Sequence, residues 1–140
     1  MINSNLHSVI KAVSKQTDKI DENARKCRDE MMTTLMSLAK REIKGQRPKG
    51  QKATIGQPPM NRTGNLRRSI KGEKSREGFG TYSAVVGPTI VYGRSLEIGG
   101  QYAPPTWSKD AKYPYMQPAF IKFRLLARGI IRKHMTLRGR

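Results

Sequence analysis

The sequence predicts an α+β fold with a long N-terminal helix, a small antiparallel β-sheet and a C-terminal helix packed on the sheet. Three observations carry this prediction. Apolar residues recur every three or four positions before residue 45, two short segments near residues 70 and 84 have strand character, and a second helical stripe follows residue 116. We expect a single domain, divided into a long helical arm (1–48), a basic loop rich in glycine and proline (49–62) and a compact α+β part (63–140).

The N-terminal arm contains no proline or glycine before Gly45. A helix from about Asn5 to Lys44 would be roughly 60 Å long at ~1.5 Å per residue, which is longer than so small a protein is wide. Either another chain buries part of its apolar stripe, or the helix breaks near residues 14–18, where apolar residues are fewest. We favour an arm that associates with other copies of the chain. The stripe consists of Leu6, Val9, Ile10, Val13, Thr17, Ile20, Ala24, Cys27, Met31, Leu35, Leu38 and Ala39.

Residues 56–70 separate this arm from the compact part. Pro58 and Pro59 fix φ and remove two backbone donors, so a helix cannot run through them. We expect the Thr63 hydroxyl to cap a short helix that follows. Leu66 and Ile70 lie four positions apart and should therefore share a face that points into the core.

Two strands are expected next, over 69–74 and 80–87, with a hairpin turn at 75–78. Residues 90–99 are predicted to form a short helix closed by Gly99. The second strand alternates Tyr82, Ala84 and Val86 with Thr81, Ser83 and Val85, which suits one buried face. In the helix, Val91, Leu96 and Ile98 are available to the core.

The C-terminal part begins with a loop over 99–115 that is rich in aromatic residues, including Tyr102, Trp107 and Tyr115. Such residues either stack on bases or anchor a loop against its own domain or a neighbouring subunit, and we favour the anchors. Pro118 suits the first turn of the final helix. The apolar stripe of that helix is expected to lie against the sheet and consists of Phe120, Phe123, Leu126, Ala127, Ile130 and Ile131.

The charge of the chain indicates an acidic partner. Lys and Arg number 28 against 10 Asp and Glu, so the formal net charge is +18. Such self-repulsion is most simply offset by a nucleic acid or an anionic protein surface. The basic stretch between residues 44 and 76 suits phosphate contacts, and it equally suits a solvated linker.

Several classes of protein are not expected. The single cysteine, Cys27, excludes an intrachain disulfide, and no apolar run approaches the ~20 residues of a membrane span. His7 and His134 have no ligand at metal-binding spacing, and the scattered acids form no pair suited to acid–base catalysis. We therefore expect no enzyme, no cofactor and no metal site.

An ordered set of short motifs resembles the neck, or tail-completion, proteins of long-tailed bacteriophages, which join the DNA-filled head to the tail. The likeness covers about residues 30–135. The motifs are Gly56 with Pro58-Pro59, Thr63-Gly64-Asn65-Leu66-Arg67-Arg68-Ser69-Ile70, Val86-Gly87-Pro88, Tyr92-Gly93 with Leu96-Glu97-Ile98-Gly99, and Pro114-Tyr115-Met116-Gln117-Pro118-Ala119-Phe120.

This resemblance implies a structural virion protein at the head–tail junction, made in the bacterial cytoplasm. It also implies a ring, usually of six subunits, around the channel through which double-stranded DNA passes. The partners would be further copies of the chain, the connector or head-completion proteins, and the tail terminator.

Two sets of residues are predicted to act in that setting. The candidate contacts to DNA or to an acidic partner are Arg47, Lys49, Lys52, Arg62, Arg67, Arg68, Lys71 and Lys74. The candidate subunit contacts are Ile20, Met31, Leu35, Tyr102, Trp107 and Tyr115. Two alternatives remain. One is a small basic protein that coats or bends DNA through the loop over 45–76 and the basic C-terminal helix, and the other is a tail terminator or minor tail component.

Overall fold

A computed structural model of the chain describes residues 2–43, 45, 54–60, 63–76, 80–99 and 111–136. The elements, in chain order, are α1 (Ile2–Glu42), α2 (Asn65–Ser69), β1 (Ile70–Arg76), β2 (Tyr82–Pro88), α3 (Val91–Ile98) and α4 (Met116–Met135). The α+β class, the long first helix, the antiparallel strand pair and the final helix are confirmed. The predicted loop over 49–62 falls largely outside the described residues.

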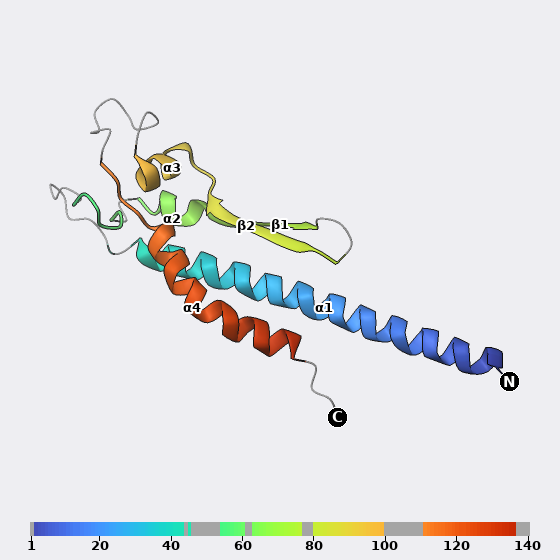
Figure 1. The fold of residues 1–140 in the computed structure, drawn as a ribbon. Coiled ribbons are helices and arrows are strands. Elements are labelled where there is room, and N and C mark those ends of the chain that lie inside the picture. The colour runs from blue at the N-terminus through green and yellow to red at the C-terminus, as the bar shows by residue number, and fades with distance from the viewer. Residues whose placement is uncertain are drawn as a thin grey trace.

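Helix α1 runs unbroken for 41 residues, so the break considered near residues 14–18 does not occur. The sheet lies along one side of α1 and α4 lies along another, with α2 and α3 gathered near the C-terminal end of α1 (Figure 1). The N-terminal half of α1 projects beyond both. The long helix is therefore the central element of the fold as well as an arm.

The last helix packs differently from the prediction. Its partner is α1, which it meets in antiparallel orientation, and it makes few contacts with the strands. Ala119, Phe123 and Ile130 are its buried residues. An apolar stripe shows that a helix is covered on one side, but it does not show by which element.

The two strands form a hairpin in which Ile70 pairs with Pro88 and Arg76 pairs with Tyr82. The alternation of β2 left open which face is covered, and the structure shows that the face with Tyr82, Ala84 and Val86 points toward α1. Gly72 allows a close approach of the sheet to α1, because a Cβ at this position would lie 2.7 Å from the Met32 side chain.

The core lies where all the short elements meet the C-terminal end of α1. Leu66 and Ile70 both point into it, as predicted from their spacing. The buried cluster consists of Ala39, Ile43, Leu66, Ile70, Leu96, Tyr115 and Ala119.

Two local predictions are wrong. Helix α2 begins after Gly64, which has a φ of 76° and makes no side-chain capping bond, so Thr63 is not its cap. In α3 only Leu96 of the three expected residues is buried, while Val91 is 86% exposed and Ile98 is 47% exposed. Gly99 does close α3, with a φ of 66°, and its N–H donates to Ser95 O.

Candidate assembly surfaces

The projecting arm exposes a row of large apolar side chains along one helix. Every described side chain from Asn5 to Ile20 is exposed. Leu6, Val9, Ile10 and Val13 each leave 56–60% of their surface in solvent. A helix that presents a one-sided apolar stripe to water is a surface for association.

Polar contacts around Tyr82 fix the tip of the hairpin to α1. The Tyr82 hydroxyl donates to the Asp21 carboxylate and accepts from Arg25 Nε at 3.2 Å. The guanidinium groups of Arg25 and Arg28 lie 5.6 and 5.5 Å from the centre of the Tyr82 ring. These contacts mark the point beyond which α1 projects without cover.

A second pair of contacts fixes β1 and α4 to α1. Lys74 Nζ lies 2.8 Å from an Asp29 oxygen, and Lys74 together with Arg28 holds the pKa of that carboxyl below its usual value. Lys133 Nζ and His134 Nε2 lie 2.8 and 2.6 Å from one carboxylate oxygen of Glu30, and both residues lower the pKa of this carboxyl group. The acids of α1 are therefore used to bind the chain's own cations.

Glu97 joins the two motifs around residues 92–99 and 114–120. One of its carboxylate oxygens accepts the N–H groups of Tyr115 at 2.8 Å and Met116 at 2.9 Å, and the other accepts the N–H of Gln117 at 2.8 Å. The carboxylate thus satisfies three backbone donors at the start of α4 and also carries the charge that a helix N-terminus favours. The role of these motif residues here is to fix α3 to α4.

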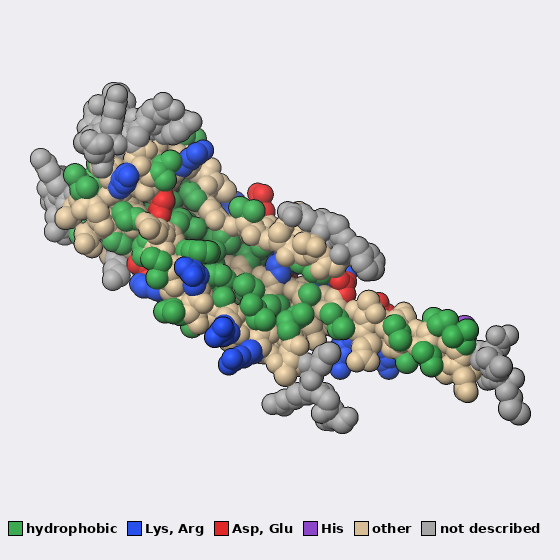
Figure 2. All heavy atoms as spheres, viewed as in Figure 1, with side chains coloured by type: hydrophobic (Ala, Val, Ile, Leu, Met, Phe, Trp, Pro, Cys, Tyr) green, Lys and Arg blue, Asp and Glu red, His purple; other side chains and the backbone are tan. Residues whose placement is uncertain are grey.

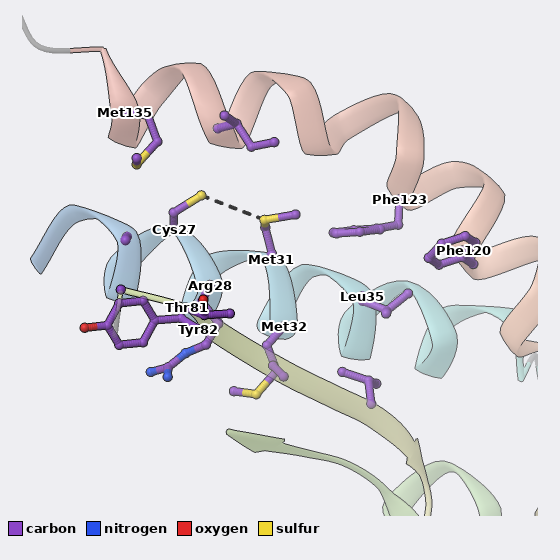
Figure 3. A pocket seen from close by; sticks show the side chains of 15 residues that line it. Cys27, Arg28, Met31, Met32, Leu35, Thr81, Tyr82, Phe120, Phe123 and Met135 are labelled. Carbon is purple, nitrogen blue, oxygen red and sulfur yellow. Dashed lines mark hydrogen bonds between the residues drawn. The ribbon is translucent and has the colours of Figure 1, made fainter. Parts of the chain in front are cut away.

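An apolar trough runs between β2 and α4, with α1 as its floor. Its volume is about 570 Å³, and its lining is mostly aliphatic, aromatic or methionine side chains. In Figure 3, Cys27, Met31 and Leu35 of α1 lie between Phe120, Phe123 and Met135 on one side and Tyr82 on the other. Burial raises the pKa of the Cys27 thiol, with a further contribution from Glu30, so this cysteine is a packing residue.

The predicted cationic residues lie on different elements and have different surroundings. Arg67 and Arg68 are exposed on α2, and Arg68 donates to the backbone oxygen of Thr63 and to Asn65 Oδ1. Lys71 is exposed on β1, whereas Lys74 is engaged by Asp29 within the chain. Four of the predicted contacts lie outside the described residues: Arg47, Lys49, Lys52 and Arg62.

Helix α4 carries a cationic stripe. The DNA-coating alternative used this basic helix, although its arginines were not in the list of candidate contacts. Arg124, Arg128 and Arg132 are exposed and lie at successive spacings of four, so they share one face of the helix. Figure 2 shows basic side chains along the edge of the body formed by α4. The four-residue spacing of the arginines, in a helix with no acid, is the signal that would have identified this stripe.

The residues predicted to contact a neighbouring subunit also have different surroundings. Ile20 is 40% exposed on the arm, and Met31 and Leu35 line the trough. Tyr115 is fully buried and its hydroxyl donates to Gly93 O at 3.1 Å, so the prediction that it contacts a neighbouring subunit is wrong. It anchors the loop against its own domain. Tyr102 and Trp107 lie outside the described residues.

Comparison with protein families identifies the chain. Residues 7–99, from the arm to the end of α3, match the family described as "Bacteriophage HK97-gp10, putative tail-component". The chain belongs to the HK97-gp10-like family. Neither a curated protein nor a solved structure matches it.

Membership in the HK97-gp10-like family makes this chain a structural component of a phage tail or neck, and hence of a virion. This confirms the resemblance drawn from the motifs. Within the described ranges, no helix is long and apolar enough to cross a membrane. The same ranges contain no cluster of three or more His, Cys, Asp or Glu residues that could hold a metal ion.

Proposed function

We propose that this protein forms a ring, with six subunits as the expected number, that joins the DNA-filled head of a phage to its tail. Its neighbours in the neck are the connector or head-completion protein and the tail terminator, and DNA passes through the ring during ejection. The observation that carries the proposal is the arm. A member of a phage tail-component family projects an apolar helical stripe that its own fold leaves uncovered.

The position in the particle is tested by imaging. Particles that carry an affinity tag on this chain, labelled and examined by electron microscopy, should show the label at the head–tail junction. Particles assembled without the protein should accumulate as filled heads and separate tails. A label along the tail tube or at its distal end would refute the neck position and favour a minor tail component.

The stoichiometry is tested on the purified protein and on assembled necks. Mass measurement of the isolated ring should give six copies of the chain. A protein that remains monomeric at high concentration, and that also fails to assemble with the neighbouring neck proteins, would contradict the ring.

Contact with DNA is the second part of the proposal, and the arginine stripe of α4 supports it. Arg124, Arg128 and Arg132 project from one face with no acid elsewhere on the helix. Arg67 and Arg68 on α2 and Lys71 on β1 are further exposed cations that could contact a polyanion. Each phosphate that such a side chain neutralises releases counterions, so binding weakens steeply as salt rises.

The DNA contact is tested by changing Arg124, Arg128 and Arg132 together to alanine and measuring duplex binding over a range of salt concentrations. The magnitude of the slope of log K against log salt should fall by about 2–3, since each lost phosphate contact removes about 0.9. The matched control changes Lys11, Lys15 and Lys19 to alanine, which removes the same charge from the arm. Equal slopes for the two triple variants would contradict a role for α4 in DNA binding.

A further inference from the structure

The apolar stripe of α1 has the spacing of a coiled-coil seam. Its positions advance by alternating steps of four and three residues, which is the heptad pattern that keeps one face of a helix against a partner helix. The seam residues are Leu6, Ile10, Val13, Thr17, Ile20, Ala24, Cys27 and Met31. The pattern crosses from the projecting arm into the body of the domain without a change of phase.

The two halves of the seam have different surroundings. In the arm, Leu6, Ile10 and Val13 are exposed to solvent over more than half of their surface. In the body, Ala24, Cys27 and Met31 form the floor of the trough. Figure 2 shows hydrophobic side chains gathered in the body and continuing along the projecting helix.

The walls of the trough also remain partly uncovered. Phe120, Ile131 and Met135 of α4 are 51%, 45% and 43% exposed although they line an apolar hollow. Methionine contributes to both floor and walls, and its flexible thioether adapts to the shape of an incoming side chain. A hollow of about 570 Å³ has room for several side chains from one face of a helix.

The lengths of the two halves agree. The arm seam from Leu6 to Ile20 spans about 21 Å, and the trough floor from Ala24 to Leu35 spans about 17 Å, at ~1.5 Å per residue. The arm cannot fold back into its own trough, because both belong to one continuous helix. An arm that lies in this trough must therefore come from another molecule.

The charge pattern of the arm favours a second copy of this chain over an acidic partner. The positions that flank the arm seam are occupied by His7, Val9, Ser14 and Gln16, which are formally uncharged at pH 7. The lysines of the arm, Lys11, Lys15 and Lys19, fall on the outer positions of the heptad. A surface that binds an acidic partner would carry cations beside the seam. Two copies of a chain of net charge +18 repel each other, so they can associate only where their cations point away from the contact.

We propose that the arm of one copy, residues 5–20, lies in the trough of a second copy, with Leu6, Ile10 and Val13 seated against Cys27, Met31 and the α4 wall. This deepens the proposed function, because it rests on self-assembly and names the two surfaces that meet. Donor and acceptor are different surfaces of the same chain, so the contact can repeat from subunit to subunit and close into a ring.

Engineered cysteine pairs provide the test, in a Cys27→Ala background because Cys27 is buried. Met31 lines the floor of the trough and is only partly buried, so Met31→Cys supplies the acceptor thiol. The thiols of Ile10→Cys and Met31→Cys lie 21 positions apart on one helix, about 32 Å, which is too far for an intrachain disulfide. Under mild oxidation, Leu6→Cys, Ile10→Cys and Val13→Cys, each combined with Met31→Cys, are examined for a disulfide-linked dimer. At least one should give the dimer, and the dimer should disappear when Met31 is left unchanged.

Lys15→Cys is the matched control, because Lys15 is exposed on the outer side of the same helix. It should give no dimer that depends on Met31→Cys. Two results overturn the proposal. One is the absence of any dimer that depends on Met31→Cys in the three seam variants, and the other is a seam dimer that persists when Met31 is unchanged, which would show arm paired with arm.

A wall variant tests the acceptor side independently. Phe120→Arg should weaken self-association by more than about tenfold, because it would bury an unpaired arginine under the incoming arm. Leu125→Arg is its control, since Leu125 lies on another face of α4 and is 80% exposed. Equal association of these two variants, with circular dichroism showing both folded, overturns the trough as the acceptor. Labelling of the head–tail junction in virions would then still support the proposed function, so the two failures are distinguishable.

Discussion

Replacing Glu97 with alanine should destabilise the protein through the start of α4. The substitution removes the acceptor of three backbone N–H groups at 2.8–2.9 Å, from Tyr115, Met116 and Gln117. Loss of a helix cap costs about 0.5–2 kcal/mol, and a charged acceptor with several donors lies at the upper end of this range or above it. Loss of the favourable charge at the helix N-terminus adds about 0.3–1 kcal/mol.

The expected total for Glu97→Ala is about 2–4 kcal/mol, since water replaces some of the lost hydrogen bonds at this half-exposed site. For a chain of this size, each kcal/mol lowers Tm by roughly 3–5 °C, so a fall of about 6–20 °C is expected. Glu97→Gln retains one acceptor oxygen and should fall between the wild type and Glu97→Ala.

Thermal unfolding followed by circular dichroism measures this effect, and amide hydrogen exchange locates it. Glu73→Ala is the control, because it removes the same carboxylate from the exposed outer face of β1. Protection of the first amides of α4 should drop in Glu97→Ala only. A melting temperature within about 2 °C of the Glu73→Ala value would refute the capping argument.

Two further predictions concern the packing and the charges of the same domain. Gly93→Ala should lower the free energy of unfolding by about 1–3 kcal/mol, because the added Cβ would lie 2.6 Å from the rigid ring of Pro88. Gly72→Ala should lower it by less, because the added Cβ would meet a flexible methionine side chain. Chemical denaturation of both variants measures the difference. Acid should also weaken the fold: the pKa values of Asp29 and Glu30 are lowered in the folded state, so their stabilisation is complete above the unfolded pKa and is lost as the pH falls below about 5. A double change of Asp29→Asn and Glu30→Gln should flatten the dependence of Tm on pH in that range, and an unchanged dependence would contradict the assignment.

Features of the structure that depend on residues close together in the sequence were predicted better than contacts between distant segments. The period of α1, the alternation of β2 and the spacing of Leu66 and Ile70 are local patterns, and each gave the correct element or face. The Thr63 cap failed because Gly64 takes the left-handed backbone conformation itself and begins α2 one position later. The first residue of a short helix therefore depends on the backbone conformation of one residue, which the sequence pattern does not give.

The contacts between distant segments could not be predicted in the same way. Glu97 lies 18 residues from Tyr115, and nothing in its neighbourhood distinguishes it from a solvated acid. The apolar stripe of α4 was compatible with either the sheet or α1, because both offer an apolar surface. The basic character of the C-terminal helix was recognised from the sequence, but the list of candidate contacts was drawn from residues 47–74 and left out the arginines at 124, 128 and 132.

The continuity of α1 has a mechanical consequence. No proline or glycine interrupts the helix between Ile2 and Glu42, so the chain has no hinge between the body and the projecting residues. The uncovered part is a lever about 24 Å long, and a ten-degree tilt of the body moves its tip sideways by about 4 Å. In the proposed ring, a subunit that tilts would therefore push its arm against the surface of the next subunit, and the motion would be transmitted around the assembly.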